Sequence, residues 1–250
     1  MTYWVVKFLL SPVLRFFYRI QVEGIEHLPA SGGAILASNH LAVCDSFFLP
    51  LVLKRRITFV AKAEYFEDPK TAWFFRSVGQ IPIKREGGSA SQRALESARE
   101  VLDGGGLFGI YPEGTRSPDG RLYKGKTGVA RLALQCGVPV IPVAMVGTRE
   151  TQPIGVPMPR LFMPITIRFG KPIDASHYAD RANDPLVLRQ ITDEAMFELR
   201  ELSGQDYVNV YASRTKDAAP EVDIDIAEPA RARVGTVRPV DEPPAVAAAG

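Results

Sequence analysis

Short apolar runs alternate with segments of helical period along the chain, and this alternation restricts the possible folds more than any other feature. Five runs are short enough to be buried strands, and they lie at 32–39, 56–62, 80–85, 107–112 and 138–147. The segments between them have helical patterns, at 46–53, 70–78, 89–102 and 127–135. A late strand is expected at 165–170 and a late amphipathic helix at 185–202. This order predicts an α/β domain whose central, largely parallel mixed sheet is flanked by helices.

The first twenty residues form an apolar segment that is interrupted by charged residues and a proline. It falls short of the roughly 20 consecutive apolar residues that a membrane-spanning helix needs, and it lacks a small-residue cleavage site. On a helix, Lys7, Ser11, Arg15 and Arg19 form one polar stripe, and aromatic residues crowd the remaining surface. The segment 1–20 is therefore expected to be an amphipathic helix in the membrane interface. The alternative is an amphipathic helix that packs on its own domain.

Composition sets the remaining limits. With 46% hydrophobic and 23% charged residues, the chain resembles an ordinary globular protein, and one catalytic domain is expected over 21–212. Residues 213–250 are rich in Ala, Pro and charge, which predicts a disordered tail. The net charge of +2 without a basic stripe argues against nucleic acid as a partner. Two cysteines, Cys44 and Cys136, provide neither a disulfide framework nor a zinc-site spacing, so no metal is expected and a reducing compartment is the default.

A histidine and an aspartate stand five residues apart after the first predicted strand. On a regular helix the side chains of His40 and Asp45 would point about 140° apart, so they could not easily meet. In a strand-to-helix loop His40 can fold back, and the carboxylate would then fix its tautomer and raise the basicity of its other nitrogen. Alone the spacing is a weak pattern, because Asp45 could equally cap the next helix beside an exposed histidine.

A second polar segment, YPEGTRSPDG at 111–120, leaves the strand predicted at 107–112. Arginine offers a planar fork of donors for phosphate, glycine allows close backbone approach, and threonine adds a hydroxyl. Two lysines follow near the start of a predicted helix, which is a natural anion site. The candidate phosphate-binding residues are Gly114, Thr115 and Arg116, in one turn with Glu113, and Lys124 and Lys126 are in support. The alternative is a solvated turn, and no nucleotide P-loop spacing is present.

A third candidate lies at the end of the strand predicted at 80–85, which closes with Lys84 and Arg85. An edge strand with charged ends would have the same sequence. Because His40, Arg85 and the 113–116 turn all fall at the ends of predicted strands, they could converge on one cleft.

Taken in order, these segments resemble the four motifs of the glycerophospholipid acyltransferase family, specifically its 1-acyl-sn-glycerol-3-phosphate acyltransferases. The first motif is matched by Asn39, His40 and Asp45, and the others are matched by 79–85, 112–117 and 138–143. The resemblance covers roughly residues 20 to 150, and the joint occurrence is far more specific than any single motif. Ala42 and Tyr111 stand where relatives often have Ser and Phe, and neither is expected to touch the proposed chemistry.

The resemblance implies a fold like that of glycerol-3-phosphate acyltransferase. It also implies transfer of a fatty acyl group, from a CoA or acyl-carrier-protein thioester, to the sn-2 hydroxyl of 1-acyl-glycerol 3-phosphate. His40 would be the general base and Asp45 its orienting carboxylate, while Arg85 and the 113–116 turn would hold the glycerol phosphate. No bound cofactor or metal is implied. The partners would be a lysophospholipid, the thioester and the bilayer, with the protein peripheral or monotopic on the cytoplasmic side of the cell membrane.

Three alternatives stay open at this point. The acceptor could be another lysophospholipid, a glycolipid or glycerol 3-phosphate. Cys44 or Ser46 beside Asp45 could be the nucleophile of a hydrolase, although no G-x-S-x-G elbow is present. The fold could also serve a non-catalytic membrane-binding protein. The segment 71–75, TAWFF, is equally suited to the bilayer and to a core, and His27 and His177 are expected in surface loops without a role.

Overall fold

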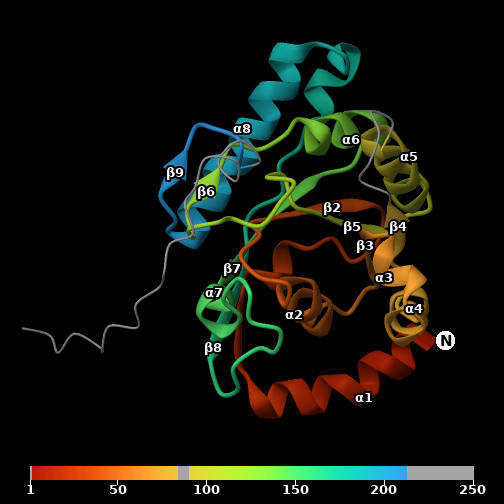
Figure 1. Cartoon of the computed structure of the whole chain (residues 1–250). Coiled ribbons are helices and arrows are strands. Elements are labelled where there is room, and N and C mark those ends of the chain that lie inside the picture. Colours follow the sequence, from red (N-terminus) through yellow and green to blue (C-terminus); the bar gives the residue numbers. More distant parts are fainter. Residues whose placement is uncertain (1, 84–89, 213–250) are drawn as a thin grey trace, which may run out of the picture. The chain divides into compact units, whose positions relative to one another are not determined.

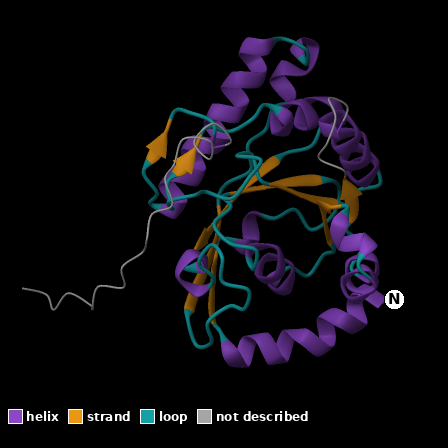
Figure 2. Ribbon diagram, viewed as in Figure 1, coloured by secondary structure: helices purple, strands orange, loops and turns teal. Residues whose placement is uncertain are grey.

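The computed structural model describes residues 2–83 and 90–212, and these residues form a seven-stranded sheet and a two-stranded sheet. The order in the large sheet is β1-β8-β7-β2-β5-β3-β4, and Figure 2 shows the strands in orange. Its strands are β1 (Arg19–Glu23), β2 (Ala34–Ser38), β3 (Ile57–Lys62), β4 (Ile81–Ile83), β5 (Leu107–Ile110), β7 (Val140–Val146) and β8 (Pro164–Phe169). The small sheet pairs β6 (Leu122–Tyr123) with β9 (Tyr207–Val208). The predicted α/β architecture is confirmed, and β1, β6 and β9 are additions to it.

Parallel pairing in the middle of the large sheet brings three strand ends together. β2 pairs in parallel with β5 on one side and with β7 on the other. After β2 the chain continues to β3, which lies on the β5 side of β2. After β5 it continues to β7, which lies on the other side of β2. The loops that follow β2 and β5 therefore leave the same edge of the sheet in opposite directions. Only the β7–β8 pair of the described sheet is antiparallel, which makes the sheet mixed.

Helices cover both faces of the large sheet (Figure 1). They are α1 (Thr2–Phe17), α2 (Asp45–Val52), α3 (Glu64–Glu67), α4 (Pro69–Ser77), α5 (Ala90–Asp103), α6 (Gly128–Cys136), α7 (Thr148–Thr151) and α8 (Pro185–Ser203), with the 3-10 turns Ile25–His27 and Ser176–Arg181. Alternate residues of β2 enter different cores. Leu36 packs with the α2 side chains Phe48 and Leu49, while Ile35 and Ala37 pack with α5, α6 and α8. Because both faces of β2 are buried, its sequence is apolar throughout.

The N-terminal helix α1 ends at Phe17, and the chain enters β1 two residues later, so the predicted segment 1–20 includes the start of a strand. The orientation of the helix is unexpected. The Lys7 ammonium donates to the Leu53 carbonyl, and the Ser11 hydroxyl is buried, so this part of the polar stripe faces the protein. The opposite side of α1 presents large apolar side chains, and Phe8 and Phe16 are 79% and 75% exposed. Contact of this side with a membrane stays a prediction.

Among residues 2–83 and 90–212, no helix combines the length and the apolar character needed to cross a bilayer. The predicted tail at 213–250 lies outside the described residues, as do Lys84 and Arg85.

Candidate active site

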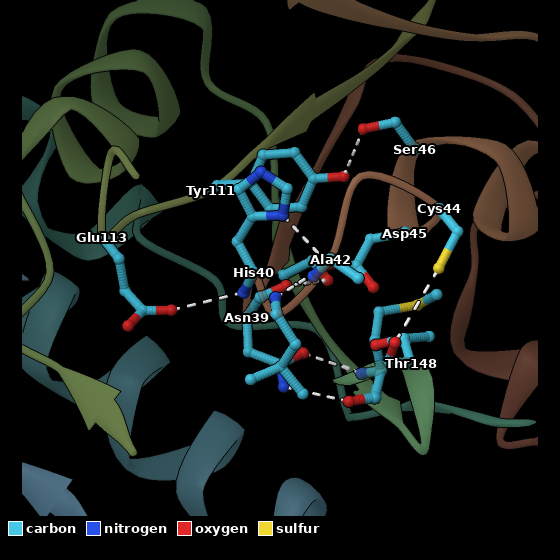
Figure 3. Close-up of polar contacts among 12 residues, drawn as sticks. Asn39, His40, Ala42, Cys44, Asp45, Ser46, Tyr111, Glu113 and Thr148 are labelled. Carbon is cyan, nitrogen blue, oxygen red and sulfur yellow. Dashed lines mark hydrogen bonds and ion pairs between the residues drawn. The ribbon is translucent and has the colours of Figure 1, made fainter. Parts of the chain in front are cut away.

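The histidine and the aspartate of the first motif are hydrogen-bonded to each other at the carboxyl end of β2. His40 lies two residues after β2 and Asp45 is the first residue of α2, and His40 Nδ1 is 2.9 Å from Asp45 Oδ2 (Figure 3). The same oxygen accepts the backbone N–H groups of Leu41, at 2.8 Å, and Ala42, at 2.9 Å. Because an ionised carboxylate only accepts, Nδ1 carries the proton and Nε2 keeps a lone pair. This arrangement suits a general base.

Capping of α2 by Asp45 is not what the structure shows. Cys44 occupies the N-cap position, and the Asp45 carboxylate turns back onto the preceding loop. The Asp45 side chain is completely buried, and that of His40 is 16% exposed. A buried carboxylate is stable only when it is hydrogen-bonded, so the loop between the two residues and the His40 ring are held together.

The backbone of His40 is hydrogen-bonded to the 112–117 turn after β5. Its N–H donates to Glu113 Oε1 at 3.3 Å, and its carbonyl accepts the Ser117 N–H at 2.8 Å. Both backbone polar groups of His40 are therefore used by the third motif, as Figure 3 shows for Glu113. The two motifs form one unit at the sheet edge, as the predicted strand ends implied.

Glu113 has a structural environment that its sequence position does not reveal. Its side chain is completely buried, and its second oxygen accepts the Tyr123 backbone N–H at 2.9 Å. Burial raises the pKa of this carboxyl to about 7, although the N–H donors of Tyr123 and His40 act in the opposite direction. The sequence prediction assigned Glu113 to the glycerol-phosphate pocket. In the structure its carboxylate instead connects the His40 loop to β6.

The remaining residues of the turn present cationic groups. Gly114 has φ 73°, and a Cβ there would come within 2.9 Å of Lys126 Nζ, so the lysine side chain crosses directly over the glycine. Arg116 is half-buried and forms no ion pair with any residue that the structure describes. Arg116 immediately precedes Ser117, which is bonded to His40, so the Arg116 backbone belongs to the same unit. Thr115, half-buried, lies between them.

Two further predicted residues have other neighbours. The Lys124 ammonium lies 5.8 Å from the centre of the Tyr211 ring, on the C-terminal segment. Asn39 is buried beneath the dyad, where its amide accepts the Met145 N–H at 2.7 Å and donates to the Met145 carbonyl at 3.0 Å. The Asn39 side chain thus continues the β2–β7 pairing by one residue, and it fixes the backbone directly before His40.

Tyr111 is a site residue that the sequence analysis placed outside the chemistry. Its ring stacks on the His40 imidazole with centroids 3.8 Å apart and an interplanar angle of 11°. Its hydroxyl is hydrogen-bonded to Ser46 Oγ at 2.9 Å, and burial, with the Asp45 charge second, raises the pKa of Tyr111 well above its usual value. The expectation that Tyr111 and Ala42 would not touch the chemistry is therefore wrong, since Tyr111 packs on His40 and the Ala42 N–H binds Asp45. Gln205, which accepts from Asn39 Nδ2 at 2.7 Å, had no signal because it lies far away in sequence.

The geometry also bears on the hydrolase alternative. The Cys44 thiol points toward the Thr148 carbonyl oxygen, 3.9 Å away, and burial together with the nearby Asp45 charge raises its pKa. Ser46 Oγ is bonded to Tyr111. Nδ1 of His40 is held by Asp45, and neither candidate nucleophile has a hydrogen bond to the imidazole in Figure 3. A nucleophile needs such a base within hydrogen-bond reach, so the site does not favour a covalent hydrolase.

Within the described part of the chain, no group of three or more His, Cys, Asp or Glu residues could hold a metal ion. The arrangement can accept a proton at Nε2 of His40 and can bind an anion near Arg116 and Lys126.

Comparison with known proteins assigns this arrangement to a family. The sequence profile of the Acyltransferase family matches residues 19–146, which include the loop with His40 and Asp45 and the 112–117 turn. A chloroplastic 1-acyl-sn-glycerol-3-phosphate acyltransferase of Arabidopsis thaliana is 36% identical over 140 residues, which are 56% of this chain and 39% of that protein. A 1-acyl-sn-glycerol-3-phosphate acyltransferase of Limnanthes alba is 32% identical over 167 residues, or 66% of this chain and 58% of its own length. The chain thus spans about two fifths to three fifths of these curated relatives.

A solved structure is similar as well. The 1-acyl-sn-glycerophosphate acyltransferase PlsC of Thermotoga maritima superposes with a TM-score of 0.60 and 28% identity, over 78% of this chain and 75% of that one.

Proposed function

This chain belongs to the acyltransferase family, and we propose that it acylates the sn-2 hydroxyl of 1-acyl-glycerol 3-phosphate to give phosphatidate. The observation that carries the proposal is the 2.9 Å contact between His40 Nδ1 and Asp45 Oδ2, in a loop that the phosphate-binding motif holds by two backbone hydrogen bonds. The names of the Arabidopsis and Thermotoga relatives support lysophosphatidate as the acceptor.

The chemistry needs one base and one good leaving group. Nε2 of His40 takes the proton of the acceptor hydroxyl as its oxygen attacks the thioester carbonyl. The tetrahedral intermediate collapses, the ester forms, the carbon–sulfur bond breaks, and the thiolate takes the proton back from the imidazolium. Asp45 keeps Nδ1 protonated and stabilises the imidazolium that forms. A thiolate leaves readily, so the reaction requires neither a bound cofactor nor a covalent enzyme intermediate.

The acceptor phosphate is proposed to lie against the 114–116 turn. Arg116 supplies the planar fork, Gly114 and Thr115 line the turn, and Lys126 adds a second positive charge. Arg85, outside the described residues, is proposed to complete this pocket. Glu113 contributes indirectly, because it orients the His40 backbone.

The acyl donor is proposed to be an acyl-CoA or acyl-carrier-protein thioester that arrives in solution, while the lipid acceptor comes from a membrane. The exposed apolar side of α1 supports a peripheral or monotopic position, proposed here to be on the cytoplasmic side of the cell membrane. Tyr18, just after α1, packs on Phe48 of α2 with ring centroids 4.9 Å apart. The membrane-facing helix is thereby coupled to the helix that begins with Asp45.

An acyl-transfer assay tests the chemistry. The purified full chain, in mixed micelles, is given lysophosphatidate with acyl-CoA or acyl-carrier protein, and phosphatidate is measured for wild type and His40→Ala. The matched control is His177→Ala, which removes a histidine that no site contact involves. Loss of activity in His40→Ala with retention in His177→Ala is expected. Full activity in His40→Ala would exclude the mechanism, and competition between lysophosphatidate, other lysophospholipids and glycerol 3-phosphate would identify the acceptor.

A further inference from the structure

We propose that the loop of residues 153–163, between α7 and β8, is a second membrane-binding element that lies beside α1 on an anionic bilayer. This inference rests on the proposed membrane association and extends it to a segment far from α1 in sequence. The loop presents large apolar side chains to the outside, namely Ile154, Met158, Leu161 and Phe162. In Figure 1 it descends from β8 to the end of α1.

The 153–163 loop is fixed to the C-terminal end of α1. The Phe162 N–H donates to the Phe17 carbonyl at 2.7 Å, and the two rings lie 5.9 Å apart. The Arg19 N–H donates to the Met163 carbonyl at 3.3 Å. Because these bonds join the two segments, their exposed apolar side chains belong to one continuous surface. We call this surface, made by α1 and the 153–163 loop, the lipid face.

Phe162 has an unfavourable backbone conformation, which its N–H bond to the Phe17 carbonyl holds in place. It is the one non-glycine residue with positive φ, 63°, among the residues that the structure describes. Bulky side chains rarely adopt this conformation, and they do so mainly where surrounding interactions compensate. Yet the Phe162 side chain is 60% exposed. The strained backbone therefore directs an aromatic ring outward, where an apolar partner outside the protein would stabilise it.

The charge of the lipid face points to a bilayer with anionic headgroups. The sequence of 2–19 and 153–163 contains four basic residues and no acidic residue, and Arg15, Arg19 and Arg160 are exposed. Basic residues near an anionic leaflet strengthen binding, and Trp4 in the same segment is a typical interfacial residue. A broad apolar surface that carries only positive charge fits lipid better than a second copy of itself, because identical cationic faces would repel each other.

A vesicle-binding measurement tests the role of the loop. The full chain with Leu161→Ser and Phe162→Asn is compared with wild type on vesicles of phosphatidylcholine with or without phosphatidylglycerol. Asparagine is chosen because it tolerates the left-handed conformation. The matched control is Leu186→Ser with Phe197→Ser, two similarly exposed residues of α8. We expect a partition coefficient about tenfold lower for the loop variant and unchanged for the control. Equal binding of wild type and loop variant would overturn the proposal.

Depth in the bilayer gives a second, independent measurement. Met158→Trp is placed in a Trp4→Phe, Trp73→Phe background, which leaves one tryptophan in the 153–163 loop. Vesicles with brominated acyl chains should quench its fluorescence, and absence of quenching on bound protein would overturn the proposal. Sedimentation without lipid tests the rival occupant: a dimer that dissociates in the loop variant would assign the lipid face to a second copy.

The outcome is separable from that of the proposed chemistry. Acyl transfer to a short-chain, monomeric lysophosphatidate needs no bilayer, so the loop variant should keep wild-type turnover on it. If wild type itself fails on this acceptor, the proposed function is wrong, while the vesicle result still decides on the lipid face.

Discussion

The loop that carries His40 and Asp45, called the dyad loop, differs from the lipid face in where its polar and apolar groups lie. Around His40 one oxygen of Asp45 accepts three hydrogen bonds and the Glu113 carboxylate accepts two, whereas the other Asp45 oxygen, Oδ1, is buried without a hydrogen-bond partner among the described residues. On α1 and in the 153–163 loop, by contrast, large apolar side chains are exposed. The hydrogen bonds of the first region all lie within the protein. The second region exposes its apolar side chains to water, and the proposed bilayer contact would remove this exposure.

This contrast separates what each region should tolerate. Changes in the dyad loop should alter catalysis or folding and leave membrane binding intact, because its interactions are internal. Changes on the lipid face should alter membrane binding and leave the free energy of unfolding nearly unchanged, since those side chains are already exposed.

The largest effect is expected for Asp45→Asn. The amide can present an N–H to His40, which would favour the tautomer that has no lone pair at Nε2. We expect kcat for phosphatidate formation to fall by about 10⁴-fold, as the loss of an orienting carboxylate does in histidine-based triads. Vesicle binding should stay at the wild-type level. The matched control is Asp119→Asn, a carboxylate in the 112–121 segment that contacts Arg121 instead of the dyad. A drop of less than tenfold in Asp45→Asn would contradict the proposed role of Asp45.

The next effect concerns stability and its dependence on pH. Burial raises the pKa of Glu113 from 4.5 to about 7, so the native state holds a proton there more tightly than the unfolded chain does. The stabilising contribution is complete below pH 4.5 and is lost as the pH rises through 7. The free energy of unfolding should therefore fall by roughly 3 kcal/mol over that interval because of Glu113.

Glu113→Gln removes this titration and serves as the comparison. Urea unfolding of both proteins in the same detergent across pH 4.5 to 8 should show a fall for wild type that the variant lacks. Parallel curves would contradict the buried ionisation. Glu113→Ala should be less stable than wild type by about 2–4 kcal/mol at all pH values, because it leaves the His40 and Tyr123 N–H groups without acceptors.

On the lipid face, Phe8→Ser with Phe16→Ser tests whether the exposed rings of α1 contribute to membrane binding rather than to folding. Both rings are exposed, so the free energy of unfolding should change by less than about 0.5 kcal/mol. Partition into anionic vesicles should fall by tenfold or more, because two aromatic side chains no longer enter the interface. The α8 control, Leu186→Ser with Phe197→Ser, should bind as wild type does. A strong loss of stability without a loss of binding would assign α1 to the protein core.

The contrast also marks what the sequence could predict. The spacing of apolar residues is a local property of the sequence. It therefore predicted the strands that line the site near their observed positions, and likewise the helices α2, α4, α5, α6 and α8. Parallel strands end at one edge, and this explains why the first and third motifs were expected to meet. β1 was missed because its five residues form an edge strand with mostly exposed side chains, directly after an apolar helix.

The orientation of side chains required the fold. A polar stripe on α1 was evident, but periodicity does not say which side faces the protein, and Lys7 proved to point inward. Glu113 has the same identity whether it binds substrate or two backbone N–H groups, and only the position of β6 distinguishes the two. Gln205 reaches Asn39 through packing between distant segments, which no local pattern encodes.

The smallest predicted effect isolates the ring of Tyr111 from its hydroxyl. Tyr111→Phe keeps the ring that stacks on His40 at 3.8 Å and removes the bond to Ser46, so kcat should fall by less than about fivefold, the cost of one neutral hydrogen bond. Ser46→Ala removes the same bond from the other side and should give a matching decrease. Tyr111→Leu removes the aromatic face over the imidazole, and kcat should fall further while KM for lysophosphatidate stays constant, because positioning of His40 affects the chemical step. If Tyr111→Leu raised KM instead, Tyr111 would line the acceptor pocket rather than position the base.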